Sequence, residues 1–392
     1  MKKFASEMLS LGGSALPPSR QSWAYIFPVA FALAYGVTFI SCSSGKGSDG
    51  DIDSIANSVF VFGGDVYVAG QKHDPSQKKY VATIWKNGVS QYLDTTASGS
   101  SMATSVFVSQ GDVYVAGIQA LGNGPYMRGV VGLATIWKNG TPQQLLDHHR
   151  NAANSVFVDG VDVYVAGIFH DGKGSFSDIM KNGIPLYPIT YSDSWYYDSI
   201  VGNSVYVANG DVYVAGAKFD PNQNMNSATV RKNGEIQFLG VENGDHHIAS
   251  STANSIFVSG ENVYVVGNFN HISNHNYGAL WINGTGHRIT GSYSQEGNSI
   301  FVYGNDCYVA GEVRNPPTMS LGSSYATLWK NPEKPQYLDS YSEWARANSI
   351  FVSDNDVYVV GEEMGEEYTR SNEFRGRTSA RLWKNGEMQE LR

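Results

Sequence analysis

The sequence is poor in cysteine and in charge. Only two of its 392 residues are cysteine, Cys42 and Cys307, which excludes a disulfide-stabilised scaffold and a zinc module. Charged residues make up 16%, and the 27 basic residues are scattered singly and outnumbered by 36 acidic ones, for a net charge of -9. Because nucleic acids are bound through clustered Lys and Arg, a nucleic-acid partner is excluded. The chain is not disordered either, since 42% of it is hydrophobic and 12% aromatic.

The N-terminal residues have the order of an export signal. Lys2, Lys3 and Arg20 precede an uncharged stretch, residues 23–40, which is soon followed by Cys42. In such signals a positive segment stays on the cytoplasmic side while an apolar one enters the membrane. The Phe-Ile-Ser-Cys tetrapeptide that ends at Cys42 resembles the lipobox of bacterial lipoproteins. This resemblance implies cleavage before Cys42 and lipid attachment to its thiol.

Two organisations of the N-terminus follow. In the first, residues 1–41 are a signal peptide of the lipoprotein type, residues 42–56 are a flexible tether, and the lipid on Cys42 holds the protein on a membrane. In the second, residues 1–41 remain as a signal anchor, because about 18 apolar residues suffice to span a bilayer. In both, the rest of the chain is exported, so we expect it in the cell envelope, facing the periplasm or the cell exterior.

One unit recurs seven times in the remaining sequence. Its first copy contains Asn-Ser-Val-Phe-Val from Asn57, Asp-Val-Tyr-Val-Ala-Gly from Asp65, Ala-Thr-Ile-Trp-Lys-Asn-Gly from Ala82, and a Gln-x-Leu element. The average spacing of about 48 residues is typical of propeller blades. The copies begin near residues 57, 104, 154, 203, 254, 298 and 348.

Each copy predicts four short strands, because its apolar runs are rich in Val, Tyr, Phe, Ile and Trp and are bounded by Gly, Asn and Asp. The first two strands are almost continuously apolar, as expected where both faces of a sheet are covered. We therefore predict that residues 57–392 form an all-β domain, a seven-bladed β-propeller of four-stranded antiparallel blades. Since this region begins with a first strand and ends with a fourth, we expect ring closure from packing between blades rather than from a shared strand.

Most recurring residues have structural explanations. Asp65 and its counterparts follow the turn between the first two strands, where a short polar side chain can bond its own backbone. The Lys-Asn-Gly at 86–88 predicts a hairpin, since Asn and Gly tolerate positive φ. Trp85 and its four equivalents are expected to pack in the core. Cys307 replaces a Val of the repeat and is expected to be a small buried hydrophobe.

This seven-fold unit behind a lipobox resembles the repeat lipoproteins with a β-propeller found in exported bacterial proteomes. The resemblance covers residues 57–392 and implies fold and location rather than activity, because propellers host binding, scaffolding and many chemistries. Better-known propeller repeats fit less well. The Trp-Asp and Gly-His signatures of WD40 repeats are absent, and the Gly-Gly doublet of kelch repeats occurs only at Gly63-Gly64.

The lengths of the connections predict where a ligand would bind. The turn between the first and second strands has one length in all copies, whereas the connections between the second and third strands, and between copies, vary. In an up-and-down blade the variable connections emerge on one face, where binding loops sit on a rigid scaffold. Aromatic side chains there can stack on sugar rings or anchor a peptide. Our candidate ligand-binding residues are the off-motif aromatics of these connections, Trp195, Tyr196, Tyr197 and Trp344.

Histidines gather in the same connections. A spacing of four residues brings imidazoles together on a helix, but the segment with such a pair is predicted to be a loop. We therefore predict no metal and no other cofactor. The candidate ligands, should a metal bind, are His271 with His275, His148 with His149, and His246 with His247.

We predict a binding or interaction module for a carbohydrate or protein ligand, acting as a monomer, and not an enzyme, because no nucleophile elbow and no phosphate loop occurs. One alternative is a glycosidase or lyase that uses paired carboxylates of the variable face. Another is a purely structural surface lipoprotein. The acids considered for catalysis are Asp147, Asp193, Asp198, Asp245, Glu296 and Glu343. The last copy has a further acid- and arginine-rich connection, interpreted as a solvated, self-compensating loop, with Glu362, Glu363, Glu366, Glu367, Arg370, Arg375 and Arg377.

Overall fold

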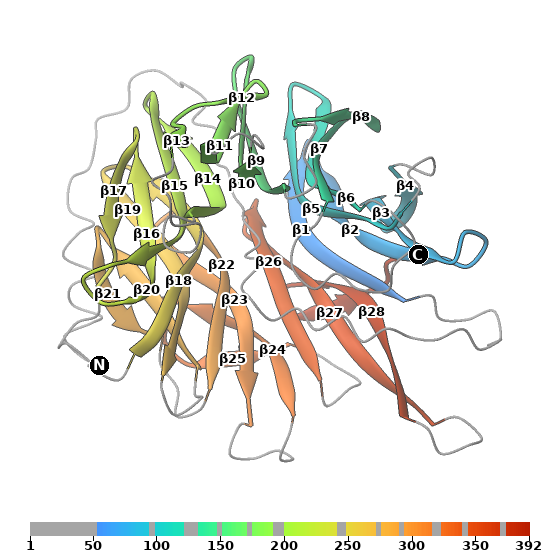
Figure 1. The fold of residues 1–392 in the computed structure, drawn as a ribbon. Coiled ribbons are helices and arrows are strands. Elements are labelled where there is room, and N and C mark those ends of the chain that lie inside the picture. Colours follow the sequence, from blue (N-terminus) through green and yellow to red (C-terminus); the bar gives the residue numbers. More distant parts are fainter. Residues whose placement is uncertain are drawn as a thin grey trace, which may run out of the picture.

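The chain folds into a ring of seven β-sheets. The computed structural model describes residues 53–93, 99–120, 132–146, 151–170, 175–190, 200–240, 248–271, 276–289, 294–315, 323–338, 344–368 and 374–392. These ranges contain strands and no helix, so none of them supplies an apolar helix able to cross a membrane. The sheets are arranged like blades around a central axis (Figure 1). The predicted all-β, seven-bladed propeller of four-stranded antiparallel blades is confirmed.

Consecutive strands build each blade from its inner to its outer edge, and in blade 3 the outer position is divided between two short strands, β12 and β13, that both pair with β11. Blades 1 and 2 contain β1 (Ser54–Phe62), β2 (Asp65–Asp74), β3 (Lys79–Lys86), β4 (Val89–Tyr92), β5 (Ser101–Ser109), β6 (Asp112–Ala120), β7 (Gly132–Lys138) and β8 (Thr141–Gln144). Blades 3 and 4 contain β9 (Ala152–Asp159), β10 (Asp162–His170), β11 (Ser175–Lys181), β12 (Ile184–Pro185), β13 (Ile189–Thr190), β14 (Ile200–Ala208), β15 (Asp211–Asp220), β16 (Met225–Lys232) and β17 (Glu235–Phe238). Blades 5 to 7 contain β18 (Ile248–Ser259), β19 (Asn262–His271), β20 (Asn276–Ile282), β21 (Thr285–Arg288), β22 (Gln295–Tyr303), β23 (Asp306–Arg314), β24 (Ser324–Lys330), β25 (Pro335–Tyr337), β26 (Ala345–Ser353), β27 (Asp356–Tyr368), β28 (Phe374–Lys384) and β29 (Glu387–Gln389).

The short turns of all blades lie on one face of the ring, which we call the turn face. It holds the turns between first and second strands and between third and fourth strands. Asn87 and Gly88 have φ values of 51° and 83°, the two positive values that a two-residue hairpin turn requires. The hairpin predicted from Lys-Asn-Gly is therefore confirmed. The opposite face, which we call the loop face, carries the connections between second and third strands and between blades.

The Asn that opens each repeat forms a β-bulge on the inner strand. In blade 1, Ala56 pairs with Gly70 and Ser58 with Ala69, so Asn57 has no partner on β2. The inner strands of all other blades show the same shift in register. The bulge brings the carbonyl oxygen of Ile55 so close to Gly70 that a Cβ would overlap it, and the equivalent contact occurs in every blade. The Gly of the repeat is thus required by this close approach.

The bulged residue and the serine after it join each blade to the next. Asn57 Nδ2 donates to the Ala103 carbonyl oxygen at 2.8 Å, and Ser58 Oγ accepts from Val106 N at 3.1 Å. Equivalent bonds recur at every interface of the ring, with the hydroxyl of Thr104 replacing the carboxamide in blade 2. Each interface therefore contains the same two buried links, in which a side chain meets the backbone of the next inner strand.

The last interface closes the ring in the same way. Asn348 Nδ2 donates to the Ala56 carbonyl oxygen at 3.0 Å, and Ser349 Oγ accepts from Val59 N at 3.2 Å. No sheet of the described ranges mixes strands from the two ends of the chain. In Figure 1, β1 lies beside β26, where these bonds form. The expected closure by blade packing, without a shared strand, is confirmed.

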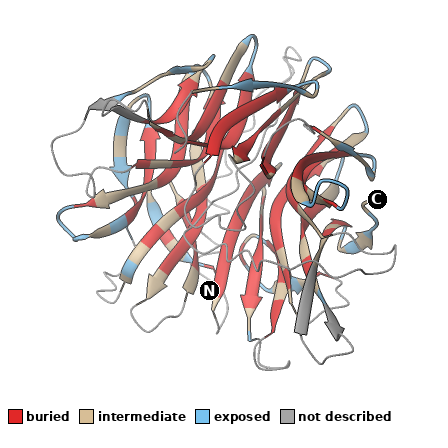
Figure 2. Ribbon diagram, turned by 45° about the vertical axis from the view of Figure 1, so that its right-hand side comes forward, coloured by how far each residue is buried: buried red, intermediate tan, exposed pale blue. Residues whose placement is uncertain are grey.

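Seven aromatic side chains form a circle around the axis of the propeller, between the bulges and the turn face. Phe60 contacts Phe107 and Phe351, each with ring centroids 4.9 Å apart. Five further contacts at 5.0–5.2 Å complete the circle. All members are at most 5% exposed, so they form a continuous part of the core, which Figure 2 shows along the inner strands. The members are Phe60, Phe107, Phe157, Tyr206, Phe257, Phe301 and Phe351.

The third strands contribute the rest of the core. The five repeat tryptophans are at most 1% exposed, as predicted. In blade 4 the same position is taken by Arg231, whose Nη1 donates to Asp178 Oδ1 of blade 3 at 2.8 Å. Both side chains are at most 4% exposed. Cys307 is buried, and burial raises the pKa of its thiol to about 12, which confirms the small hydrophobe predicted at this position.

The recurring aspartates join the two turns of a blade rather than bonding their own backbone, which corrects the explanation inferred from the sequence. Asp65 Oδ2 lies 2.7 Å from Lys86 Nζ, and its Oδ1 accepts from Asn87 Nδ2 at 2.7 Å. The lysine also lies over the ring of Tyr67. Five other blades have the same ion pair. In blade 5 a hydrogen bond from Asn283 to Asn262, which stands in place of the aspartate, replaces it.

Candidate functional site

Most of the residues predicted for a site lie outside the described residues. These residues are Cys42, Trp195, Tyr196, Tyr197, His148, His149, His246, His247 and His275, together with the acids Asp147, Asp193, Asp198, Asp245 and Glu343. Their proposed roles stay predictions. Trp344, His271 and Glu296 are described, and all three lie on the loop-face side of their blades.

His271 ends β19 beside an aromatic residue. Its ring packs edge-on against Tyr277, with centroids 6.0 Å apart. Its predicted partner, His275, is not among the described residues. Within the described ranges, no group of three His, Cys, Asp or Glu side chains is placed to hold a metal ion.

Trp344 stands at the start of the inner strand of blade 7. Its carbonyl oxygen accepts from Met364 N at 2.9 Å, and it forms an isolated parallel bridge with Ser324 of blade 6. The residue is partly exposed. Arg346 follows two positions later on the same strand and therefore lies on the same side of it. The predicted aromatic is thus placed next to a buried charged cluster that the repeat pattern does not predict.

This cluster occupies positions that we call the rim pairs. A rim pair consists of the two residues that face each other on the first and second strands, on the loop-face side of the bulge and one position beyond the pair that contains the repeat Gly. Because the inner strands surround the axis, the rim pairs form a ring. They are, from blade 1 to blade 7, Ile55 and Gln71, Met102 and Ile118, Ala152 and Ile168, Val201 and Ala217, Thr252 and Asn268, Glu296 and Glu312, and Arg346 and Glu362.

The ring of rim pairs is apolar on one side and charged on the other. Blades 2 to 4 contribute only apolar side chains, and Met102, Ile118 and Ala152 form a small hydrophobic cluster separate from the main core. Blade 5 contributes hydroxyl and amide groups, and blades 6 and 7 contribute only charges. A structural repeat needs no such asymmetry, so these charges mark blades 6 and 7 as the candidate functional site.

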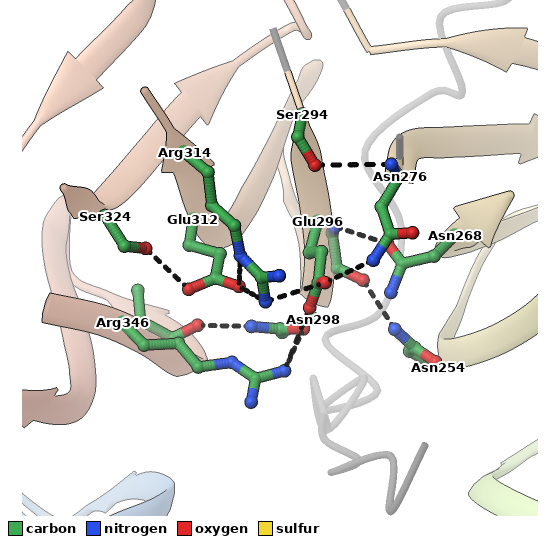
Figure 3. A network of polar contacts seen from close by, with 12 residues as sticks. Asn254, Asn268, Asn276, Ser294, Glu296, Asn298, Glu312, Arg314, Ser324 and Arg346 are labelled. Carbon is green, nitrogen blue, oxygen red and sulfur yellow. Dashed lines mark hydrogen bonds and ion pairs between the residues drawn. The ribbon is translucent and has the colours of Figure 1, made fainter. Parts of the chain in front are cut away.

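In blade 6, two carboxylates share one arginine (Figure 3). Glu296 lies directly opposite Glu312, and Arg314 Nη2 lies 3.0 Å from Glu296 Oε1. Arg314 Nε donates to Glu312 Oε1 at 2.9 Å. Asn276 Nδ2 also donates to Glu296 Oε1, at 2.8 Å, and the other oxygen of Glu312, Oε2, accepts from Ser324 Oγ at 2.7 Å.

Burial and charge act differently on these two acids. Burial, followed by the charge of Glu312, raises the pKa of Glu296. Burial acts in the same direction on Glu312, but Arg346 and Arg314 together hold the pKa of that carboxyl below its usual range. Arginines contact both carboxyls, since Arg314 lies against Glu296 and Glu312 and Arg346 lies against Glu296. The two acids therefore differ in protonation although they stand opposite each other on paired strands.

Blade 7 joins this cluster through Arg346. Its Nη2 lies 3.3 Å from Glu296 Oε2 and 3.3 Å from Asn298 Oδ1. Glu362 lies directly opposite on β27 and is partly exposed. Burial raises the pKa of Glu362 to about 7. The charge of Arg346 opposes this shift, and the charge of Glu312 adds to it. A carboxyl that titrates near neutral pH beside an arginine is typical of functional sites.

The acid-rich segment of the last blade is not the solvated loop expected from its composition. Glu362 and Glu363 lie on β27, and Arg375 and Arg377 lie on β28, which pairs with it. Glu363 is buried, and its Oε2 lies 2.6 Å from Arg381 Nε. The loop interpretation was wrong for the described part of this segment, because β27 continues to Tyr368 and β28 begins at Phe374, well beyond the strand ends of the other blades. Arg370 lies outside the described residues.

No local pattern in the sequence marks Arg346 or Glu312 as a site residue. Each stands in a stretch that deviates little from the repeat, so neither forms a motif. An alignment of the seven copies at the residue two before the repeat Asn, and at the residue after the repeat Gly, would have found them. Only there do blades 6 and 7 place charge where blades 2 to 4 place Met, Ile, Ala and Val.

Comparisons with known proteins concern the fold alone. No protein-family model and no curated protein sequence matches this chain. Among solved structures, the β-propeller domain of the Trilobed protease from Pyrococcus furiosus, which has an open velcro topology, is 14% identical, with a TM-score of 0.48 over 87% of this chain and 96% of that domain. The acylaminoacyl peptidase of Pyrococcus horikoshii is 13% identical, with a TM-score of 0.47 over 86% of this chain and 52% of its own, so this chain spans about half its length. The phage phi92 endosialidase is 10% identical, with a TM-score of 0.43 over 87% of this chain and 70% of its own.

Proposed function

We propose that this protein is a binding module that takes a carbohydrate or protein ligand on its loop face, with the charged rim pairs of blades 6 and 7 at the centre of the site. The observation that supports this most is the asymmetry of the ring. Arg346 and Glu362 stand where blades 2 to 4 carry only apolar side chains. Burying charge is costly, so it is retained where it performs a task.

The fold suits this function because the inner strands beneath the site are held rigidly, whereas the connections of the loop face differ between blades. Seven equivalent interfaces and a closed aromatic ring fix the inner strands. The connections of the loop face differ from blade to blade in length and sequence. A rigid scaffold that presents variable connections is the usual arrangement of a binding surface. Trp344, beside Arg346, adds a large amphipathic side chain of the kind that dominates binding energies.

We further propose that the propeller is attached to a membrane through lipid on Cys42 and faces the periplasm or the cell exterior as a monomer. The support for this is the order of charge, apolar stretch and lipobox-like tetrapeptide at the N-terminus. A tether of residues 42–56 would hold the ring close to the membrane and leave the loop face free to meet its ligand.

The experiment that tests the binding function compares aromatic variants of the loop face. The full chain, Trp195→Ala, Trp344→Ala and the turn-face control Val89→Ala are applied to arrays of oligosaccharides and of cell-envelope proteins. We expect all variants to keep the wild-type melting temperature, and the two Trp variants to lose about tenfold or more in affinity for the ligand that the wild type binds, about 1.4 kcal/mol. Unchanged affinity in both Trp variants would contradict the proposed site.

A further inference from the structure

The rim pair of blade 7 has hydrogen-bonding capacity that the described part of the protein does not use. Both hydrogen bonds of Arg346 are made by Nη2, each at 3.3 Å, and its Nε is buried without a partner. The side chain is nevertheless 18% exposed. Glu362, directly across the strand pair, is also partly exposed. The two side chains thus stand opposite each other where solvent reaches part of each.

The charges around this pair select the kind of ligand. Glu296, Glu312 and Glu362 carry three negative charges when ionised, against two positive charges on Arg314 and Arg346. An anionic ligand would add to the uncompensated negative charge, and a cationic one would face the guanidinium of Arg346. A hydroxyl group avoids both costs, because it accepts one hydrogen bond and donates another without carrying charge.

We propose that Arg346 and Glu362 bind a neutral sugar through two adjacent hydroxyl groups, one accepting from the guanidinium and the other donating to the carboxylate. The inference rests on the proposed binding function and narrows its ligand class. Trp344, two residues before Arg346, is partly exposed and is the aromatic side chain that we propose to pack against the C–H face of the same sugar. Adjacent hydroxyls and a C–H face are features that neutral sugars combine.

The titration of Glu362 makes this arrangement dependent on pH. Its carboxyl faces Arg346 of β26 and the charge of Glu312 on β23, while its partner on β28 is the uncharged Ala380. With a pKa of about 7, the ionised fraction falls about tenfold from pH 8 to pH 6. A protonated carboxyl is a weaker acceptor for the sugar hydroxyl than a carboxylate, so we expect sugar affinity to fall by about the same factor over this range.

The test uses matched hexasaccharides with the full chain in detergent. Neutral chitohexaose and anionic hyaluronan hexasaccharide are titrated calorimetrically at pH 8 and pH 6, with cellohexaose, xylohexaose and mannohexaose as further neutral probes. Chitosan hexamer is titrated at pH 6, where its amines are protonated and it is cationic. The variant Glu362→Gln keeps the shape of the side chain and removes its charge. The control Glu390→Gln makes the same change at an exposed residue that pairs with Arg392, away from the rim.

We expect at least one neutral hexasaccharide to bind, about tenfold more weakly at pH 6 than at pH 8, and Glu362→Gln to lose about tenfold at pH 8 together with the pH dependence. Glu390→Gln should behave as the wild type. Binding that Glu362→Gln leaves unchanged, or no binding of any neutral hexasaccharide, overturns the inference. If only a charged hexasaccharide binds and Trp344→Ala weakens it, the binding function stands and the neutral-sugar inference falls. If sugars bind but neither Glu362→Gln nor Trp344→Ala changes their affinity, the neutral-sugar inference falls, and so does the placement of the sugar site on the rim of blades 6 and 7.

Discussion

Asn348 donates a hydrogen bond from Nδ2 to the carbonyl oxygen of Ala56, 3.0 Å away and 292 residues earlier in the chain. This bond has the same form as the bond between Asn57 of blade 1 and Ala103 of blade 2, two blades that follow each other in the sequence. The interface that closes the ring is therefore equivalent to the interfaces inside it. A propeller of this kind needs no shared strand, because each bulge already carries a link to the next blade.

Removal of the closing link should cost as much as removal of an internal one. Asn348→Ala and Asn203→Ala each leave a buried carbonyl oxygen, of Ala56 or of Ala253, without its donor. We expect each variant to lower the free energy of unfolding by about 1–3 kcal/mol, measured by urea denaturation. A much smaller loss for Asn348→Ala would show that the closing interface is weaker than the others.

We expect the two residues of the buried ion pair between blades 3 and 4 to replace, as a pair, the uncharged residues that the repeat has at these positions. Arg231→Met leaves Asp178 buried without its cation and should cost about 3–5 kcal/mol. The double variant Asp178→Thr with Arg231→Trp introduces the residues that blade 1 has in these positions, Thr83 and Trp85. We expect it to recover most of the loss in thermal and urea unfolding. A double variant as unstable as the single one would contradict this interpretation.

The aspartates of the turn face should contribute to stability in a pH-dependent way. Hydrogen bonds from Lys232 and Asn233 hold the pKa of Asp211 below its usual value. A lowered pKa in the folded state gives stability that is present above the unfolded value of about 3.9 and is lost as the pH falls through the folded value. We expect Asp211→Asn to be less stable than the wild type at pH 7 and to lose less stability on acidification, measured by urea unfolding between pH 7 and pH 2. Parallel pH profiles would disprove this role.

Lipid attachment has its own test. Cys42→Ser should abolish metabolic labelling with a fatty-acid analogue and release the propeller from the membrane fraction, because the thiol is the proposed attachment atom. Mass spectrometry of the mature N-terminus provides the control, since cleavage before Cys42 is expected in the wild type. Membrane attachment that persists in the variant, with residues 1–41 retained, would favour the signal anchor.

The fold could be predicted from the sequence because its determinants are local and repeated. Asn-Gly turns recur in six of the seven copies, and apolar runs of strand length recur in all seven, so one deviating copy does not change the prediction. Even the closure of the ring could be inferred from the order of strands at the two ends. The bulge at Asn57 could not, because a bulge depends on the register between two strands and leaves no local pattern.

The site was harder to predict because it consists of departures from the repeat. Trp344 was found as an off-motif aromatic in a variable connection. Arg346, two residues later, lies inside a strand whose other residues follow the pattern, and its meaning appears only when Glu296 and Glu362 are brought beside it. Long-range pairing of this kind cannot be read from one blade. The aromatic run at 191–199 lies outside the described residues, so its part in the site remains a prediction.

The most direct test of the account is amide hydrogen–deuterium exchange of the full chain with and without the neutral hexasaccharide that binds. Ligand bound to the rim of blades 6 and 7 should slow exchange in residues 295–298, 311–314, 344–347 and 361–364, which carry the charged rim pairs and Trp344. Exchange at the turn-face residues 62–66 and 86–90 should not change. Protection confined to the turn face, with none in blades 6 and 7, would contradict the proposed site.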